Sequence, residues 1–446
     1  MVQIEARTAK GMRDFLPVDM LKREYVIRTI EEVFQLYGFE PLQTPILENN
    51  ETLLGKYGEE AEGLIYSAKH GRQSESSVSM RYDLTVPLAR VVAQYENDIN
   101  FPFKRYHIAP VFRGERPQRG RFREFYQCDA DIVGVSGMEA DAELISLAIM
   151  VYRRLGFDNV TVKINNRKLL TGMGIYAGVS DEQLGDLYRS VDKFDKVGAD
   201  GVQKELIERG LPSDVVERMM TLLQAGGKGT EVLDNVEDVL GEFEVAKQGI
   251  DELRQMAHHL NLLDVPENFY AFDFTMVRGL GYYTGPIFET VLNGETIGSI
   301  TGGGRYDDLV GIFRKESMPT TGISLGIERI ITLMDEGNMY PESIGQTVVQ
   351  VLVTVFNDDM RDESAALAMR LRQAGIKAEL YMTDSRLKLG KQFGHADKKG
   401  IPIVAVMGPD EAEADEVSLK RLRDGHEVKV KRGTAADKVR ELLGID

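Results

Sequence analysis

The chain has 446 residues, of which 43% are hydrophobic and 28% charged, and its formal net charge is −17. This composition is ordinary for a globular protein, and no apolar run approaches the ~20 residues that a membrane-spanning helix needs. The single cysteine, Cys128, excludes an internal disulfide framework, and residues 1–15 lack the apolar core of a signal peptide. At roughly 150 residues per domain, we expect a cytoplasmic protein of about three domains.

The acidic surplus is unevenly distributed along the chain. Residues 346–446 carry 17 basic and 17 acidic side chains, so the net charge arises entirely from residues 1–345. Within that acidic part, residues 104–123 contain seven Lys or Arg and a single acidic residue, Glu115. Because salt screens distant charges over about 10 Å, this local excess of positive charge predicts a binding site for a polyanion.

Helical and extended patterns alternate in the first 165 residues. Apolar spacing predicts a helix over Asp19–Tyr37. The segment Phe39–Leu47 reads as extended, and its two prolines restrict it to an edge or irregular strand. Two β-rich runs, Phe101–Phe112 and Phe122–Val133, flank a basic loop and predict an antiparallel hairpin. A further helix is expected over Gly137–Leu155.

The composition changes between residues 165 and 264, where Glu, Lys, Leu, Val and Met recur at helical spacing. This stretch predicts a helical insertion. Strand character returns over Pro286–Leu292, and the following Asn293-Gly294 predicts a tight hairpin turn into a strand over Thr296–Thr301. A helix is expected over Ile323–Glu336.

Residues 338–346 have the composition of a linker, and strand and helix patterns alternate after them. The predicted strands of this last part are Val348–Phe356, Lys377–Met382 and Ile401–Val406, with helices between them. Such alternation predicts a small, mostly parallel α/β domain over residues 347–446.

The most informative stretch is Val111–Gln127, VFRGERPQRGRFREFYQ, in which charged and aromatic residues recur on two strands around a loop. This pattern is typical of an ATP-binding site. Arg113 would clamp the α-phosphate, where the pentacoordinate transition state gains negative charge. Glu115 would accept a hydrogen bond from the adenine amino group, Arg121 would reach the γ-phosphate, and Phe125 would offer a face to the purine. The alternative, a solvated basic hairpin, is disfavoured by the fixed offsets of the aromatic residues.

Six short blocks spread along the chain carry the family signal: Gly11–Pro17 (GMRDFLP), Tyr37–Leu47, Val111–Gln127, Arg278–Tyr283 (RGLGYY), Gly302–Asp307 (GGGRYD) and Gly322–Arg329 (GISLGIER). The set resembles the class II aminoacyl-tRNA synthetases and, within them, the histidyl-tRNA synthetase family. In the resemblance the second, third and last blocks are the three class II motifs. The RGLGYY and GGGRYD blocks point to the histidine enzymes and disfavour another class II synthetase. The resemblance covers essentially the whole chain.

The resemblance implies an α+β catalytic domain with a mainly antiparallel sheet, made of residues 1–164 and 265–337 and interrupted by the helical insertion of residues 165–264. Residues 347–446 would form an α/β anticodon-binding domain, and the first class II motif implies a homodimer. The implied activity is the ATP-dependent formation of histidyl-adenylate and transfer of histidine to the 3′ end of tRNA(His). ATP would be a substrate with Mg²⁺ on its phosphates, and no metal cage made by the protein is expected.

The resemblance also implies a histidine site made of Asp83, Leu84, Thr85, Arg113, Gln127, Asp131, Arg278, Tyr282 and Tyr283. Asp83 and Thr85, with Gln127, would hold the ammonium group. Asp131 and the two tyrosines would read the ring nitrogens, one a donor and one an acceptor in the neutral imidazole. Reading both nitrogens rejects amino acids of similar shape, because a wrong side chain leaves buried polar groups unpaired. Without the resemblance, Asp131, Tyr282 and Tyr283 could equally be ordinary strand residues.

Two arginines, Arg113 and Arg278, are the implied catalytic residues, placed on both sides of the α-phosphate. Arg329 of the third motif would complete the ATP site formed with Arg113, Glu115, Arg121 and Phe125. The chain departs from the family at Gly281, where an acidic residue usually precedes the paired tyrosines. This departure puts the fine positioning of the neighbouring arginine in doubt.

Contacts with tRNA are expected in two places. Gln118 and Arg119, in the loop of the second motif, are candidates for the acceptor end. Arg386, Lys388 and Gln392 are candidates in the last domain, where positive charge supplies phosphate affinity and an amide can read single-stranded bases. A solvated basic helix face is the alternative there.

A different class of function also fits the catalytic part of the chain. Non-catalytic paralogues of this family act as histidine-sensing regulatory subunits of ATP phosphoribosyltransferase. Such a regulator need not keep the complete ATP set and typically lacks the C-terminal domain. Both features are present here, so the sequence favours the ligase.

Overall fold

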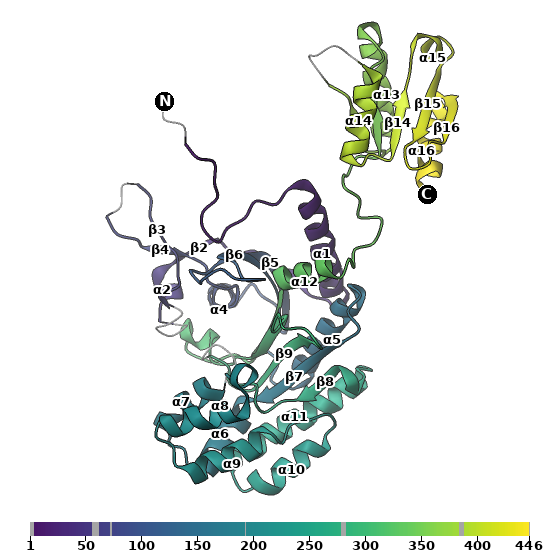
Figure 1. Ribbon diagram of the computed structural model, residues 1–446. Coiled ribbons are helices and arrows are strands. Elements are labelled where there is room, and N and C mark those ends of the chain that lie inside the picture. Colours follow the sequence, from purple (N-terminus) through teal and green to yellow (C-terminus); the bar gives the residue numbers. More distant parts are fainter. Residues whose placement is uncertain are drawn as a thin grey trace. The chain divides into compact units, whose positions relative to one another are not determined.

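The computed structural model describes residues 4–55, 62–71, 74–191, 193–277, 282–382 and 388–445. The chain divides into two compact units, one of Met1–Asp14 and Val26–Met339 and the other of Phe15–Tyr25 and Tyr340–Asp446 (Figure 1). The helical insertion lies within the first, larger unit. Within the described ranges, no helix is long and apolar enough to cross a bilayer.

The larger unit is built on an eight-stranded sheet. Five of its seven strand pairs are antiparallel, and the two outermost pairs are parallel. The mainly antiparallel sheet and the hairpin over residues 101–133 are therefore confirmed. Side by side, the strands are β1 (Glu40–Pro41), β5 (Phe103–Phe112), β6 (Glu124–Val133), β11 (Thr320–Gly326), β10 (Thr301–Arg305), β9 (Pro286–Leu292), β7 (Val160–Asn166) and β8 (Tyr270–Phe272).

Besides these strands, the larger unit contains a small sheet and several helices, the first of which belongs to it from Val26 onward. The sheet contains β2 (Leu47–Asn49), β4 (Val78–Met80) and β3 (Ser67–Ala68). The helices are α1 (Pro17–Leu36), α2 (Asn50–Leu53), α4 (Thr85–Gln94), α5 (Glu139–Arg154) and α12 (Ile327–Glu336), with short 3-10 helices over Glu267–Phe269 and Val310–Ile312. Helix α1 begins two residues before its predicted start, because proline fits the first turn of a helix.

The helical character expected of residues 165–264 is confirmed, and Figure 1 shows these helices gathered in teal beside β7 and β8. Glycine lets two of them pack closely: a Cβ added at Gly172 would lie 2.4 Å from the Cβ of Ala246. The helices are α6 (Arg167–Ala177), α7 (Asp181–Val191), α8 (Phe194–Glu208), α9 (Ser213–Leu223), α10 (Glu231–Leu240) and α11 (Glu244–Leu262).

Two predicted boundaries near the third motif are wrong. Strand β9 matches its predicted bounds, and the glycine of the following turn, Gly294, has φ +88°, which suits glycine. The next strand, however, begins at Thr301 instead of Thr296. Ile323–Gly326, predicted to begin a helix, belong to β11 instead. Since β11 is hydrogen-bonded to β6 on one side and β10 on the other, its pairing outweighs the helical spacing of its apolar residues.

The smaller unit contains a five-stranded sheet in the order β13 (Ala378–Leu380), β12 (Val351–Val353), β14 (Ile403–Val406), β15 (Glu416–Arg421) and β16 (Glu427–Lys431). The α/β class is confirmed, but the expected mostly parallel sheet is wrong: β12 is parallel to both neighbours, while the β14–β15 and β15–β16 pairs are antiparallel. The two strands that were not predicted, β15 and β16, form a hairpin that follows the predicted elements in the chain. The helices are α13 (Arg361–Gln373), α14 (Leu389–Lys399), α15 (Pro409–Glu413) and α16 (Ala435–Leu443), with 3-10 helices over Asp358–Met360 and Arg432–Thr434.

A buried polar network fixes the central strands of the larger sheet to α5. Arg305 on β10 pairs with Asp141 on α5, and the two side chains are 3% and 0% exposed. The guanidinium also donates to the carbonyl of Val135 at 2.8 Å, and Asp141 accepts from Thr321 Oγ1 of β11 at 2.8 Å. A buried ion pair needs such additional hydrogen bonds to offset the loss of hydration. The network therefore holds β10 and β11 in one position relative to the helix.

Candidate active site

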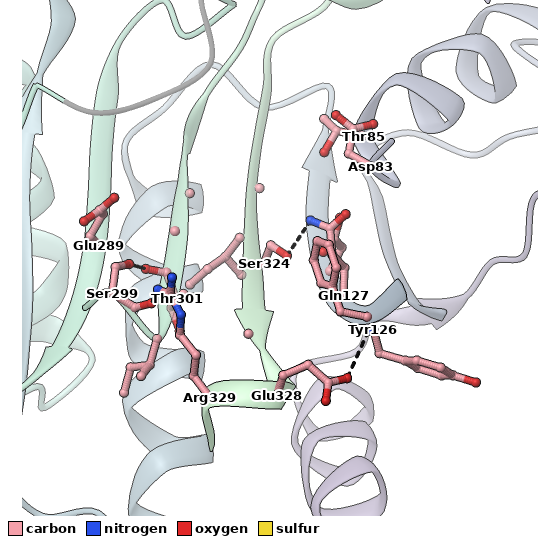
Figure 2. A pocket seen from close by; sticks show the side chains of 18 of the residues that line it. Asp83, Thr85, Tyr126, Gln127, Glu289, Ser299, Thr301, Ser324, Glu328 and Arg329 are labelled. Carbon is pink, nitrogen blue, oxygen red and sulfur yellow. Dashed lines mark hydrogen bonds between the residues drawn. The ribbon is translucent and has the colours of Figure 1, made fainter. Parts of the chain in front are cut away.

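A cavity of about 420 Å³ lies on the face of the large sheet formed by β6, β11, β10 and β9. The strand register places Ser324 of β11 between Asp129 of β6 and Gly302 of β10, and Gly302 opposite Glu289 of β9. Since directly paired residues point to the same face of a sheet, this row crosses the floor of the cavity. Figure 2 shows Asp83 and Thr85 on one side of the glycine-bearing strands β11 and β10, and Glu289 on the other.

Glycines leave the centre of this floor as bare backbone. A Cβ added at Gly302 would meet no atom within 4 Å, so the space above it is open. At Gly322, a Cβ would lie 2.0 Å from Oδ1 of Asp131, and only glycine fits beneath that carboxylate. A planar ring or a phosphate can therefore approach the strands more closely than any side chain would allow.

The residues predicted for the ammonium group lie at the start of α4 and on β6. Asp83 and Thr85 line the cavity, and Oδ1 of Asp83 accepts from the backbone N–H of Val86 at 3.0 Å. Gln127 donates from Nε2 to Oγ of Ser324 at 2.9 Å (Figure 2), and its Oε1 has no hydrogen-bond partner among the described residues. All three residues predicted for the ammonium group therefore line the cavity.

Leu84 was predicted for the same site but does not line the cavity. Its side chain is fully buried against Ala109, Val111 and Phe125. Its carbonyl accepts from a guanidinium nitrogen of Arg105 at 3.2 Å. The side chain of Leu84 therefore belongs to the core beneath the site, which corrects the expectation for this residue.

Three tyrosines form the wall at the other predicted subsite. The ring centroids of Tyr282 and Tyr283 are 5.0 Å apart, and Tyr306 lies 5.7 Å from the first and 6.4 Å from the second. Burial, with carboxylates nearby, raises the pKa of Tyr283 above its ordinary value, so its hydroxyl stays protonated at neutral pH. Tyr306 donates to Oδ1 of Asp131, whose Oδ2 lies 2.8 Å from the guanidinium of the buried Arg105.

Sequence analysis missed a second buried carboxylate, Asp129. It lines the cavity, its residue is 2% exposed, and its Oδ1 has no hydrogen-bond partner among the described residues. Burial, together with the neighbouring charge of Asp131, raises the pKa of Asp129 to about 7, although Arg105 and Ser324 oppose this. Strand alternation places every second residue on one face. That rule, applied between Gln127 and Asp131, would have predicted Asp129 in the site.

The predicted ATP residues of the hairpin all line the same cavity. The guanidinium of Arg113 lies 4.4 Å from the ring centroid of Tyr82 and 5.1 Å from that of Phe125, and its Nε donates to the carbonyl of Tyr82 at 3.0 Å. Such stacking holds the arginine in one orientation. Arg121 pairs with Glu115 at 2.9 Å, so each of these two side chains has the other as its partner.

The start of α12 lies beside the hairpin and also lines the cavity. Arg329 lines it and donates to the carbonyl of Ser299. The neighbouring Glu328 is 5% exposed, accepts from the backbone N–H of Tyr126 at 3.3 Å and pairs with Arg13. Arg13 also lies 3.2 Å above the ring of Phe122. The N-terminal GMRDFLP block is thereby attached to both the hairpin and the third motif.

Several predicted residues lie elsewhere. Arg278, Gly281 and Arg386 are outside the described residues. Gln118 and Arg119 are exposed on the hairpin loop, where Nε of Arg119 lies 3.2 Å from a carboxylate oxygen on α12.

The two remaining RNA candidates belong to the smaller unit. Lys388 is exposed directly before α14. Gln392, in contrast, is fully buried: its Nε2 donates to the carbonyl of Val355 at 2.8 Å, and its Oε1 accepts from the N–H of the same residue at 2.9 Å. Both ends of this amide are thus occupied by the backbone, which corrects the expectation that Gln392 reads bases.

The raised pKa of Asp129 predicts a dependence of stability on pH in the ligand-free protein. Between about pH 4 and 7 the unfolded chain has lost this proton while the folded chain keeps it, so stability falls as the pH rises through this range. Asp129→Asn removes the effect. We expect the variant to unfold at a higher temperature than the wild type, with a larger difference at pH 8 than at pH 5.

Thermal unfolding at pH 5, 6, 7 and 8 measures this difference, and Asp98→Asn at an exposed position is the matched control. A difference between Asp129→Asn and wild type that stays constant across the four pH values would contradict the assignment.

Comparison with known proteins shows which family this chain belongs to. Residues 11–330 match the family model for histidyl-tRNA synthetase, and residues 350–442 match that for the anticodon binding domain. A histidine–tRNA ligase from Aeropyrum pernix is 43% identical over 442 residues, covering 98% of each chain. A crystal structure of histidyl-tRNA synthetase from Nostoc sp. PCC 7120 superposes with a TM-score of 0.85 at 33% identity, covering 98% of this chain and all of that one.

The fold is also shared with a Bacillus halodurans protein described as an ATP phosphoribosyltransferase regulatory subunit/histidyl-tRNA synthetase, with a TM-score of 0.73 at 22% identity, covering 88% of this chain and 97% of that one. At this identity the likeness concerns the fold alone. The family model and the 43% identity to the Aeropyrum pernix ligase together show that this chain belongs to the histidyl-tRNA synthetase family.

Proposed function

We propose that this chain is a histidine–tRNA ligase that activates L-histidine with ATP and transfers it to the 3′ end of tRNA(His). The observation that carries the proposal is a single cavity lined by the arginines and the aromatic ring expected for ATP and by the carboxylates and tyrosines expected for histidine. These residues come from segments more than 200 positions apart in the sequence. The retained ATP set and the anticodon-binding match favour the ligase over a histidine-sensing regulatory subunit.

In the first step, the histidine carboxylate attacks the α-phosphorus, the new carboxyl–phosphorus bond forms, and pyrophosphate leaves. No general base is needed, because the attacking carboxylate is already ionised. Arg113, oriented by Tyr82 and Phe125, would neutralise charge as it develops on the α-phosphate. Arg278, outside the described residues, is proposed for the opposite side of the same phosphate.

The rest of the nucleotide would occupy the end of the cavity near the hairpin loop and α12. Arg121 and Arg329 would bind the outer phosphates, and Phe125 would face the purine. The ion pair between Arg121 and Glu115 would open when ATP binds, because a phosphate replaces the carboxylate on the guanidinium. Glu115 would then be available to the adenine amino group.

Histidine would bind across the glycine floor. Its ammonium group would lie at Asp83, Thr85 and Gln127, all of which line the cavity. Its ring would lie at the tyrosine wall, with Asp131 beside it. An ammonium group next to these oxygens also compensates for their burial.

ATP implies Mg²⁺, and the lining of the cavity fits this ion in part. Within the described ranges, no three His, Cys, Asp or Glu side chains are placed to hold a metal by themselves. Glu289 nevertheless lines the cavity, and a single carboxylate together with phosphate oxygens is a common Mg²⁺ environment. When bound, the ion would supply positive charge to the leaving pyrophosphate.

The same proposal assigns surfaces to RNA and to a second copy of the chain. Gln118 and Arg119 would contact the acceptor end of tRNA, and Arg386 and Lys388 the anticodon region. The first-motif segment exposes two apolar side chains, with Ile46 44% and Leu47 47% exposed. Exposed apolar groups favour burial in an interface, which supports a homodimer. We place its activity in the cytoplasm.

ATP–pyrophosphate exchange with each of the twenty amino acids tests the proposal. We expect exchange with histidine alone, and Arg113→Ala to lower kcat about 10²–10³-fold because one donor to the developing charge is lost. Arg116→Ala, an exposed residue of the same loop, is the matched control. Histidine binding without exchange under any condition would favour the regulatory alternative.

The RNA surface is tested by the double variant Arg386→Ala/Lys388→Ala. Two phosphate contacts would be lost, so the KM for tRNA in histidine charging should rise about tenfold or more and depend less steeply on salt. Exchange without tRNA should stay unchanged. Arg423→Ala, also exposed in the smaller unit, should affect neither assay, and equal losses in both assays by the double variant would refute the assignment.

A further inference from the structure

The N-terminal GMRDFLP block has no role in the proposed function, although it contacts two of the segments that line the cavity. The backbone carbonyl of Gly11 accepts from the N–H of Arg123 on the hairpin at 2.9 Å. Two residues further on, Arg13 pairs with Glu328 at the start of α12, 315 positions away in the chain. The block thus meets the hairpin and the third motif together.

Glycine allows the close approach on the hairpin side. Gly11 has φ +84°, and an added Cβ would lie 2.8 Å from Cδ of Arg123 and 2.9 Å from Cγ of Pro117, so this position requires glycine. Arg123 in turn donates from Nε to the backbone carbonyl of Glu115 at 3.0 Å. Through this one arginine, the N-terminal block is attached to the backbone of the residue proposed for the adenine amino group.

Arg13 bridges the hairpin and α12 with a single guanidinium. Its central carbon lies 3.2 Å from the ring centroid of Phe122, a stacking distance, and its Nη2 pairs with Oε2 of Glu328. Phe122 directly follows Arg121 in the chain, and Glu328 directly precedes Arg329. The two side chains that Arg13 touches are therefore the chain neighbours of the two arginines proposed for the outer phosphates of ATP.

The same pair compensates for the burial of Glu328. Only 5% of this side chain is exposed, whereas that of Arg13 is 33% exposed. Oε1 of Glu328 accepts from the backbone N–H of Tyr126 on β6 at 3.3 Å (Figure 2). A buried carboxylate is stable only where cations and N–H donors replace its lost hydration, so the pair with Arg13 holds Glu328 between β6 and α12.

Support of this kind matters for ATP, because both arginines must meet its phosphates at once. The side chain of Arg121 is 37% exposed, and its ion pair with Glu115 would open when ATP binds. The placement of Arg121 then depends on the backbone next to it, at Phe122. Since displacing a positioned group by about 1 Å costs a reaction about 100-fold, contacts that fix the distance between the two arginines have functional value.

We propose that Arg13 is a positioning residue of the ATP site. By joining Phe122 to Glu328, it fixes the two phosphate-binding arginines relative to each other, and it touches no substrate itself. The inference rests on the proposed function and adds to it a residue that acts through others. Histidine would bind to other residues of the cavity, so its affinity should not depend on Arg13.

The test is Arg13→Ala in the full-length protein, assayed by histidine-dependent ATP–pyrophosphate exchange. We expect the KM for ATP to rise about 10- to 100-fold, because misplaced arginines lose charge-assisted hydrogen bonds to the phosphates. The dissociation constant for histidine, measured by calorimetric titration without ATP, should stay at the wild-type value. Arg7→Ala, whose side chain is 77% exposed near the same block, is the matched control and should leave both measurements unchanged.

A second substitution separates loss of the bridge from burial of a charge. In Glu328→Gln the amide oxygen can still accept from Tyr126, but no ion pair holds Arg13, so the KM for ATP should rise as well. The double variant Arg13→Ala/Glu328→Gln contains no buried carboxylate without its partner and should fold even where Arg13→Ala does not. Its KM for ATP should equal that of Glu328→Gln, since both substitutions break one bridge.

A purely stabilising role of Arg13 predicts a different pattern. It would lower the amount of folded enzyme, and with it the apparent kcat, while the KM for ATP stayed unchanged; that result would overturn the inference. Equal weakening of histidine and ATP by Arg13→Ala would also overturn it, as would additive effects in the double variant or a wild-type KM for ATP in Glu328→Gln.

Failure of the proposed function can be recognised separately. If the wild type shows no exchange with histidine, that function fails, and calorimetric titration of ATP with Mg²⁺ still compares Arg13→Ala with wild type. A lowered ATP affinity in the variant would then support the role of Arg13, and an equal affinity would refute it.

Discussion

The register between β6, β11 and β10 is the constraint on which the cavity depends. It places glycines of the two inner strands beside the polar side chains of β6, so that bare backbone and buried acceptors share one face. A slip of one residue would turn every side chain to the opposite face. Hydrogen bonding on both edges of β11 and the buried pair between Arg305 and Asp141 oppose such a slip.

This arrangement has a consequence for stability. Buried acceptors without a hydrogen-bond partner destabilise the protein, since their hydration is lost and no partner replaces it. Asp129 and Gln127 each have such an atom. Function and stability are therefore opposed at this face of the sheet, and the glycines that open the floor remove packing that side chains would otherwise supply. Bound substrate would restore both the hydrogen bonds and the contacts.

Much of the fold could be predicted from the sequence, because local periodicity determines it. The hairpin of β5 and β6, strand β9 and the helical insertion all follow from patterns within a short window. The start of α12 could not be predicted, since the end of β11 is fixed by partners about 20 and 200 residues earlier. The last hairpin, β15–β16, follows the alternating patterns and was not recognised as strand.

The candidate site divides in the same way. Arg113 and Phe125 were predicted from the pattern of charged and aromatic residues on the hairpin, and both line the cavity. The burial of Gln392 and the core position of Leu84 depend on packing between distant segments, which a motif does not encode. Asp129 could have been predicted, because strand alternation alone places it on the same face of β6 as Gln127 and Asp131.

The central claim is that histidine lies on the bare floor, and Gly302→Val tests it most directly. The position is on a strand, outside the left-handed region, with open space above it, so valine should fold normally there. Calorimetric titration of histidine would measure the effect. The account predicts an unfolding temperature like that of the wild type with histidine affinity lowered at least about 100-fold, equivalent to ~2.7 kcal/mol. Wild-type affinity in a normally folded Gly302→Val protein would contradict it.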